Sequence, residues 1–198
     1  MIAVVKYNAG NVYSVMNALK RIGADAVLTD DESVILSSDK VIFPGVGEAS
    51  TAMAYLKERG LDYVLSNLRQ PFLGICLGMQ LMTRHSDEGD VDLLSIFPDD
   101  EVLRFPKNTN FKVPHVGWNT IKCIDCDLFY KVEKDSYVYF VHSYYVPQSK
   151  SSIAITNYDC VDFSAAISRD NYYGLQFHPE KSGAVGEQIL RNFVERVK

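Results

Sequence analysis

The sequence predicts an α/β fold with a central, mostly parallel sheet that is flanked by helices and extended by antiparallel strands in its second half. Strand-like and helix-like segments alternate over the first half of the 198 residues, which is typical of a parallel sheet with helices on both faces. The strands of this half are consecutive apolar residues, as expected for strands buried on both sides. Residues 102–168 carry short aromatic and β-branched runs separated by polar turns, which indicates antiparallel strands.

The first strand is expected over residues 2–6, and a turn at residues 8–11 follows it. Asn11 can cap the next helix, in which apolar residues recur at helical spacing over residues 12–22 until Gly23 ends it. The other elements of the first half are strands at 26–29 and 40–43, helices at 49–59 and 61–68, and a strand that ends just before Cys76.

The second half continues the sheet and then closes with a helix. The expected elements are strands at 137–145, 152–156, 163–168 and 172–177, and a helix at about 184–197. The strand at 172–177 leads directly to His178. No repeat, low-complexity segment or linker interrupts the sequence, so we expect one domain over residues 1–198.

Composition excludes several classes of function. The residues are 47% apolar and 23% charged with a net charge of −5, and the lysines and arginines are scattered, so no nucleic-acid-binding surface is indicated. No run approaches the roughly 20 apolar residues that cross a bilayer. The first residues lack the basic start and long apolar stretch of a signal peptide. We therefore expect a cytoplasmic protein.

The chain contains four cysteines, at positions 76, 123, 126 and 160. A disulfide framework is not expected in a chain of this length without a secretion signal. Cys123 and Cys126 form a single C-x-x-C without a second pair or a histidine at zinc-finger spacing, so support for a zinc site or a redox role is weak. We expect neither a metal nor an organic cofactor.

The segment from Phe72 to Gln80 is the most informative part of the sequence. An apolar run ends at Cys76, with a glycine two residues before it and another two residues after it. This is the pattern of a nucleophile elbow, in which a sharp turn between a strand and a helix strains the central residue and requires small neighbours. A buried structural cysteine is the alternative that the isolated motif leaves open.

A base and a carboxylate occur about a hundred residues later, at His178 and Glu180. A histidine can exchange a proton with a thiol, and a carboxylate can orient the imidazole, so these residues complete a Cys-His-Glu triad with Cys76. Sites in open α/β sheets lie at the carboxyl ends of the strands. The P-G-V-G segment at 44–47 also follows a predicted strand, so we expect it to converge with Cys76 and His178 at one edge of the sheet.

Five stretches of the chain together carry a family resemblance. They are N-A-G-N at 8–11, P-G-V-G-E at 44–48, G-I-C-L-G-M-Q at 74–80, P-H-V-G-W-N at 114–119 and H-P-E-K-S at 178–182. These stretches resemble the class I, triad-type glutamine amidotransferases, which have a flavodoxin-like fold, and within them the glutaminase subunits of imidazole glycerol phosphate synthases. One departure is visible, because the family commonly opens with D-Y-G-x-G-N, whereas Lys6 here replaces the acid and Asn8 replaces a glycine.

The resemblance implies a reaction and roles for the triad. Cys76 would attack the side-chain carboxamide of glutamine, His178 would protonate the leaving ammonia and then activate water, and Glu180 would orient His178. The oxyanion would be bound by the backbone N–H of Leu77 and by the loop at 45–47. The residues implied in binding the oxyanion or glutamine are Gly45, Val46, Gly47, Leu77, Gln80, Ser143 and Tyr144.

The resemblance also implies a partner, a (β/α)₈-barrel cyclase subunit that forms a heterodimer with this chain and receives its ammonia through an internal channel, in histidine biosynthesis. The implied interface residues are Asn11, Pro114, His115, Gly117, Trp118, Asn119 and Lys181. Because glutaminase activity in this family is low without the partner, we hypothesise that the loop at 45–47 is held inactive until docking favours the productive orientation.

Three other functions remain open from the sequence. The chain could be a paralogue that supplies ammonia to a synthetase of amidinated surface sugars, or a stand-alone hydrolase of glutamyl compounds. It could also be a binding module with an inactive glutaminase fold, although the intact Cys76, His178 and Glu180 argue against this.

Overall fold

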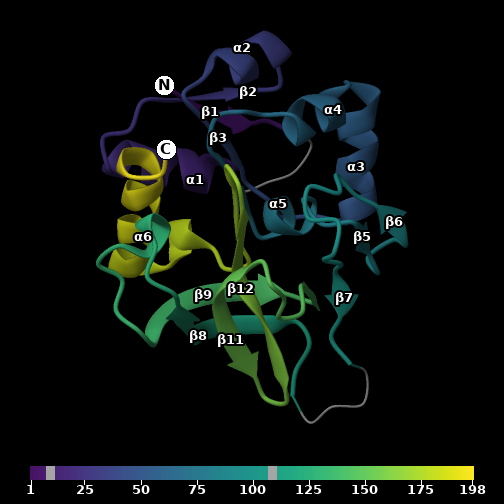
Figure 1. The fold of residues 1–198 in the computed structure, drawn as a ribbon, viewed down its shortest axis with the longest axis vertical. Helices are drawn as coiled ribbons and strands as arrows, with labels where there is room; N and C mark the ends of the chain where they lie inside the picture. Colours follow the sequence, from purple (N-terminus) through teal and green to yellow (C-terminus); the bar gives the residue numbers. More distant parts are fainter. Residues whose placement is uncertain (8–11, 107–110) are drawn as a thin grey trace.

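Nine strands form one sheet in the computed structural model, which describes residues 1–7, 12–106 and 111–198 (Figure 1). The sheet begins with five parallel strands, in the order β2 (Ala26–Thr29), β1 (Ile2–Val5), β3 (Lys40–Phe43), β4 (Phe72–Ile75) and β13 (Tyr172–Leu175). It continues with antiparallel strands, in the order β12 (Val161–Arg169), β11 (Ser152–Tyr158), β8 (His115–Cys123) and β9 (Ser136–His142). The predicted fold class is confirmed.

Helices cover both faces of the parallel part of the sheet (Figure 1). One face packs against α1 (Val12–Arg21) and α6 (Gly183–Glu195), and the other packs against α2 (Glu32–Ser37), α3 (Ala49–Glu58) and α4 (Leu61–Ser66). Strand β1 contributes to both cores, because successive side chains of a strand point to opposite faces. Ile2 and Val4 belong to the core under α1 and α6, whereas Ala3 and Val5 belong to the other. The apolar runs of the sequence therefore reflect burial on both sides.

Most predicted elements of the first half lie where the sequence places them, with small differences at their ends. Helix α2 is an addition, because its six residues are too few to show a helical period. The helix is instead fixed at its start by Asp31, whose carboxylate accepts hydrogen bonds from the backbone N–H groups of Ser33 and Val34. The described part of the chain contains no helix long and apolar enough to span a membrane.

The β-prone stretch at 137–145 divides at Ser143. Strand β9 ends one residue before it, and β10 (Tyr144–Tyr145) leaves the main sheet to pair with β7 (Leu103–Arg104). The remaining short elements are β5 (His85–Ser86), β6 (Val91–Asp92), α5 (Leu77–Gln80) and the 3₁₀ turns η1 (Asp127–Phe129) and η2 (Pro179–Lys181). The division at Ser143 matters for function, because this residue and Tyr144 line a cavity.

Helix α6 packs tightly against the segment that carries His178 and Glu180. A Cβ atom added at Gly186 would lie 1.9 Å from the carbonyl oxygen of Pro179 and 2.8 Å from Cβ of Ser182. Both distances are far below van der Waals contact, so only glycine permits this approach. The position of the His178 segment is therefore tied to the packing of α6.

We predict that Gly186→Ala destabilises the protein by about 1–3 kcal/mol, because the added methyl group must displace the backbone at Pro179. An ordinary Gly→Ala change inside a helix has the opposite sign and stabilises by roughly 0.5–1 kcal/mol. Urea unfolding of both proteins measures the difference. A variant as stable as the parent, or more stable, would show that α6 and η2 are not in close contact.

Candidate active site

Cys76 lies at a sharp turn between β4 and α5. Its backbone has φ +52° and ψ −105°, a conformation that residues with a side chain rarely adopt. The two flanking glycines are required by close contact: a Cβ at Gly74 would lie 2.3 Å from the carbonyl oxygen of Gly78, and one at Gly78 would lie 2.2 Å from that of Phe43. The strand, turn and helix occur in the predicted order, although α5 has only four residues and all of them are buried.

His178 and Glu180 form a buried ion pair next to this turn. Nδ1 of His178 lies 2.8 Å from Oε1 of Glu180, and each side chain is only 1% exposed. Since Nδ1–H donates to the carboxylate, Nε2 is the ring nitrogen left for chemistry. Nε2 makes no aligned hydrogen bond within the described residues, and an ionised Cys76 acts electrostatically on the imidazole.

The protonation of His178 reflects two opposing effects. Burial lowers its pKa, but the negative charge on Cys76 and then the Glu180 carboxylate outweigh burial and raise the pKa to about 10. The imidazole is therefore protonated at neutral pH when the sulfur is ionised. The structure brings together the thiol, the imidazole and the carboxylate of the predicted triad.

A cavity of about 260 Å³ opens beside the sulfur. Its lining residues are Val46, Gly47, Cys76, Leu77, Gln80, Glu88, Val141, His142, Ser143 and Tyr144. Six of the seven residues predicted to bind the oxyanion or glutamine are among them. The seventh, Gly45, lies behind this wall, where a Cβ would meet Cβ of Leu77 at 2.6 Å. The volume and the few polar groups of a mostly apolar lining suit one small molecule with a polar end.

The loop at 45–47 is held by Tyr7, the tyrosine of the D-Y-G-x-G-N pattern, to which the sequence assigns no role. The backbone N–H of Val46 donates to the hydroxyl oxygen of Tyr7 at 2.9 Å, and the same hydroxyl donates to the carbonyl of Val46 at 3.0 Å. The Tyr7 ring stacks on Phe43 with a centroid distance of 4.8 Å. Burial raises the pKa of Tyr7, so the hydroxyl keeps its proton and can make both bonds. Tyr7 therefore engages both backbone polar groups of Val46.

Glu88 is a second residue that sequence reasoning missed. It lines the cavity, and its Oε2 accepts a hydrogen bond of 3.0 Å from the backbone N–H of Ala49 at the start of α3. Burial raises its pKa, and the bond from Ala49 partly offsets that rise. Nothing in the local pattern distinguishes Glu88 from the other acids nearby, so only the fold reveals its place.

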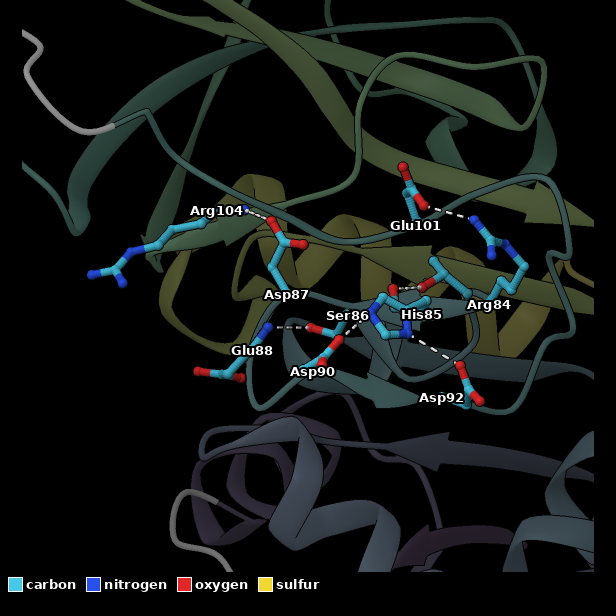
Figure 2. A network of polar contacts seen from close by, with 10 residues as sticks. Arg84, His85, Ser86, Asp87, Glu88, Asp90, Asp92, Glu101 and Arg104 are labelled. Carbon is cyan, nitrogen blue, oxygen red and sulfur yellow. Dashed lines mark hydrogen bonds and ion pairs between the residues drawn. The ribbon is translucent and has the colours of Figure 1, made fainter.

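The segment that carries Glu88 is braced by its own polar contacts (Figure 2). The His85 ring lies between Asp90 and Asp92 at 3.2 and 3.1 Å, and Ser86 Oγ accepts from the backbone N–H of Glu88 at 3.0 Å. A salt bridge of 2.7 Å joins Arg84 to Glu101. In Figure 2 the Glu88 carboxylate points away from this network. The network therefore holds the backbone of the segment and leaves the carboxylate for the cavity.

The predicted interface residues have different surroundings. Pro114, Trp118 and Lys181 are exposed, Gly117 and Asn119 are half-buried, and Asn11 lies outside the described residues. His115 is buried, and its Nδ1 lies 3.0 Å from Nε2 of His142. Its side chain therefore lies inside the protein, behind the face that Trp118 presents.

The described residues contain no group of three or more histidine, cysteine, aspartate or glutamate side chains suited to a metal ion. The four cysteines are free thiols. Burial raises the pKa of both Cys123 and Cys126, which disfavours the thiolate that metal binding and redox exchange need. Both side chains pack against the core beneath α1 and α6.

Comparison with known sequences and structures covers almost the whole chain. Residues 3–197 match the family described as "Glutamine amidotransferase class-I". Among solved structures, one described as a glutamine amidotransferase has a TM-score of 0.73 at 15% identity and covers 98% of this chain and 97% of its own. A glutamine amidotransferase from Thermotoga maritima has a TM-score of 0.68 at 15% identity, with 99% and 96% covered. These two likenesses show the shared fold.

Closer relatives define the family further. The imidazole glycerol phosphate synthase subunit HisH of Bacteroides fragilis is 59% identical over 195 residues, which are 98% of each chain. The protein of the same name from Haemophilus influenzae is 46% identical over 197 residues, which are 99% of this chain and 98% of the other. The chain therefore belongs to the class-I glutamine amidotransferases and, among them, to the family of imidazole glycerol phosphate synthase HisH subunits.

Proposed function

We propose that this chain hydrolyses glutamine to glutamate and ammonia at Cys76, and that it supplies the ammonia to a cyclase subunit of imidazole glycerol phosphate synthase in histidine biosynthesis. The observation that carries the proposal is the buried set of Cys76, His178 and Glu180 beside a cavity, in a chain 59% identical to a HisH subunit. Four free cysteines suit the reducing cytoplasm in which we place this reaction.

The proposed chemistry begins with attack of the Cys76 sulfur on the carboxamide carbon. As the C–S bond forms, charge moves to the carbonyl oxygen, to which the backbone N–H of Leu77 donates. The proton on Nε2 of His178 passes to the nitrogen, the C–N bond breaks, and ammonia leaves behind a glutamyl thioester. Nε2 then takes a proton from water, the water oxygen attacks the thioester, and glutamate leaves as the C–S bond breaks.

Glu88 supports glutamine as the substrate. A free glutamine carries an α-ammonium group at the end opposite its carboxamide, and an enclosed cation needs an anionic partner. Glu88 is the acid among the cavity-lining residues, and the backbone N–H of Ala49 binds one of its two carboxylate oxygens, Oε2. We assign the α-ammonium group to this carboxylate.

The contact between Tyr7 and Val46 supports the proposed switch. The loop at 45–47 is expected to give the second oxyanion donor, but the N–H of Val46 already donates to the Tyr7 hydroxyl. A peptide group must rotate before this N–H can serve an oxyanion. In our proposal, the low-activity state is the one in which Tyr7 holds Val46, and partner docking favours the released state.

The proposed docking surface for the (β/α)₈-barrel cyclase is the outer face of β8 and β9. Val116, Trp118 and Tyr137 are 54%, 54% and 61% exposed there, a concentration of large apolar side chains that suits an interface. Trp118 lies edge-on to Tyr139, and Lys181 Nζ lies 5.9 Å from the centre of the Tyr139 ring. We place the partner on this face, with Trp118 as its apolar anchor.

Cys76→Ala provides the main test. In a mixture with the cyclase and its acceptor substrate, we predict that glutamine-dependent product formation falls by at least about a thousandfold. Synthesis from added ammonium salts should stay near the parent rate, because the cyclase does not need the thiol when ammonia is provided. Rates of glutamate and product release measure both. Cys160→Ala, at an exposed cysteine, is the matched control and should change neither. Loss of both activities in Cys76→Ala would contradict the proposed division of labour.

Tyr7→Phe tests the switch, because it removes the hydroxyl and keeps the ring on Phe43. We predict that glutamine hydrolysis by the chain alone rises about tenfold, since two hydrogen bonds that hold Val46 are lost, and that the partner-stimulated rate changes little. Tyr172→Phe is the matched control. Its buried hydroxyl also bonds to backbone, at Leu68 and Leu65, but Tyr172 lies at the start of β13, at the opposite ends of the parallel strands from the cavity. If Tyr7→Phe without its partner hydrolyses glutamine more slowly than the parent, the switch is rejected.

Glu88→Gln tests the assignment of the α-ammonium group. We predict that KM for glutamine rises roughly tenfold or more while kcat changes much less, because a charge-assisted bond to the substrate is lost and the triad is untouched. Glu101→Gln, on the same segment but paired with Arg84 at the surface, should leave KM unchanged. An unchanged KM in Glu88→Gln would place the α-ammonium group elsewhere.

A further inference from the structure

Gln176 is a fully buried polar residue directly after β13, two residues before His178. Its side-chain amide makes two contacts. Oε1 accepts a hydrogen bond of 3.0 Å from Nε2 of Gln80, and Nε2 donates to the sulfur of Cys76 at 3.6 Å. A buried amide must satisfy its polar atoms. Here one of its donors is satisfied by the nucleophile itself.

The orientation of this amide is determined by its neighbours. Nε2 of Gln80 has two protons, and both are used on carbonyl oxygens: one on the backbone of Tyr144 at 3.0 Å and the other on Oε1 of Gln176. Rotation of either side-chain amide by 180° would bring two oxygens or two N–H groups together. Gln80 therefore fixes the oxygen of Gln176 on its own side and leaves the NH₂ group facing the sulfur.

The charge state of the sulfur decides what this contact does. A thiolate accepts hydrogen bonds, and such bonds to a charged group are stronger than those between neutral groups. The carbonyl oxygen of Val141, 3.9 Å from the sulfur, can be used only by a thiol proton. Gln176 thus stabilises the ionised sulfur, whereas Val141 favours the protonated one.

We propose that Gln176 is a further catalytic residue: its amide N–H is a second donor to the Cys76 thiolate, beside His178, and Gln80 is the positioning residue that aims it. This inference rests on the proposed function only in taking Cys76 as the nucleophile. The hydrogen bond from Gln176 stabilises the attacking thiolate. It becomes weaker once the sulfur is part of a thioester, because a thioester sulfur is a poor acceptor. Because Gln80 also lines the cavity, the substrate site and the nucleophile share this pair of amides.

Alkylation of the full chain by iodoacetamide tests the proposal without glutamine. The reaction forms an S–C bond and releases iodide at a rate that follows the thiolate. Mass spectrometry of the Cys76 and Cys160 peptides from one digest gives both rates, so the exposed Cys160 reports on reagent and pH in every sample. In Gln176→Met, which keeps the volume and removes the donor, we expect Cys76 to react about tenfold more slowly at pH 7 and its rate profile to move to higher pH.

Gln176→Glu separates a chemical role from a structural one. It keeps the size of the side chain and an acceptor for Gln80, but it turns a carboxylate toward the sulfur. We expect Cys76 to react more slowly than in Gln176→Met at pH 8, where like charges repel. If the amide is only structural, Gln176→Glu at pH 8 or a folded Gln176→Met at pH 7 reacts at the parent rate, and either result overturns the proposal. Thermal unfolding identifies the folded samples.

The alkylation experiment can succeed or fail independently of the test of the proposed glutaminase function. Slower alkylation in both variants supports the role of Gln176 even if the chain and its cyclase release no glutamate. Conversely, full glutamine hydrolysis by the parent together with unchanged alkylation in the variants would leave the glutaminase intact and reject Gln176 as a donor.

Discussion

The active site depends on crowding of the backbone around Cys76. The loop after β3, the end of β4 and the start of α5 approach so closely that side chains at Gly45, Gly74 or Gly78 would overlap their neighbours. The strained conformation of Cys76 costs roughly 1–3 kcal/mol and persists only where the surroundings determine it. They do so through the sheet, since the backbone N–H of Cys76 donates to the carbonyl of Leu175 on β13 at 2.6 Å. The same strand then delivers Gln176 and His178 to the sulfur.

Charge compensation is the second requirement of this arrangement. Removing an ion from water costs several kcal/mol unless it is paired, and the carboxylate and imidazole of the triad are each 1% exposed. When the sulfur is ionised, the protonated His178 lies between two negative groups, Cys76 and Glu180, and the N–H of Gln176 provides a further donor to the sulfur. The buried groups are therefore interdependent, and the position of each reflects the charge of the others.

The sequence allows the triad and the fold class to be predicted because few residue types can do this chemistry and their spacing is distinctive. Tyr7 and Gln176 could not be found in that way. Their partners lie 39 and 100 residues away in the chain, and tyrosine and glutamine are common in unrelated roles. His115 illustrates another gap. It lies in the P-H-V-G-W-N stretch, but side chains of a strand alternate, so Val116 and Trp118 face outward while His115 faces the core.

Strand β9 connects the proposed docking surface to the nucleophile. The carbonyl of Tyr139 accepts from the backbone N–H of His178 at 2.9 Å, and its own N–H donates to Ser182 Oγ at 2.9 Å. Two residues later, Val141 lies beside the sulfur. A partner on the outer face could therefore shift the triad through backbone bonds without touching it. The opposite wall of the cavity, at Val46, is held by Tyr7 on the parallel side of the sheet. In our proposal, docking acts through β9 and the release of the loop acts at Val46, so full activity requires both to adopt their productive positions.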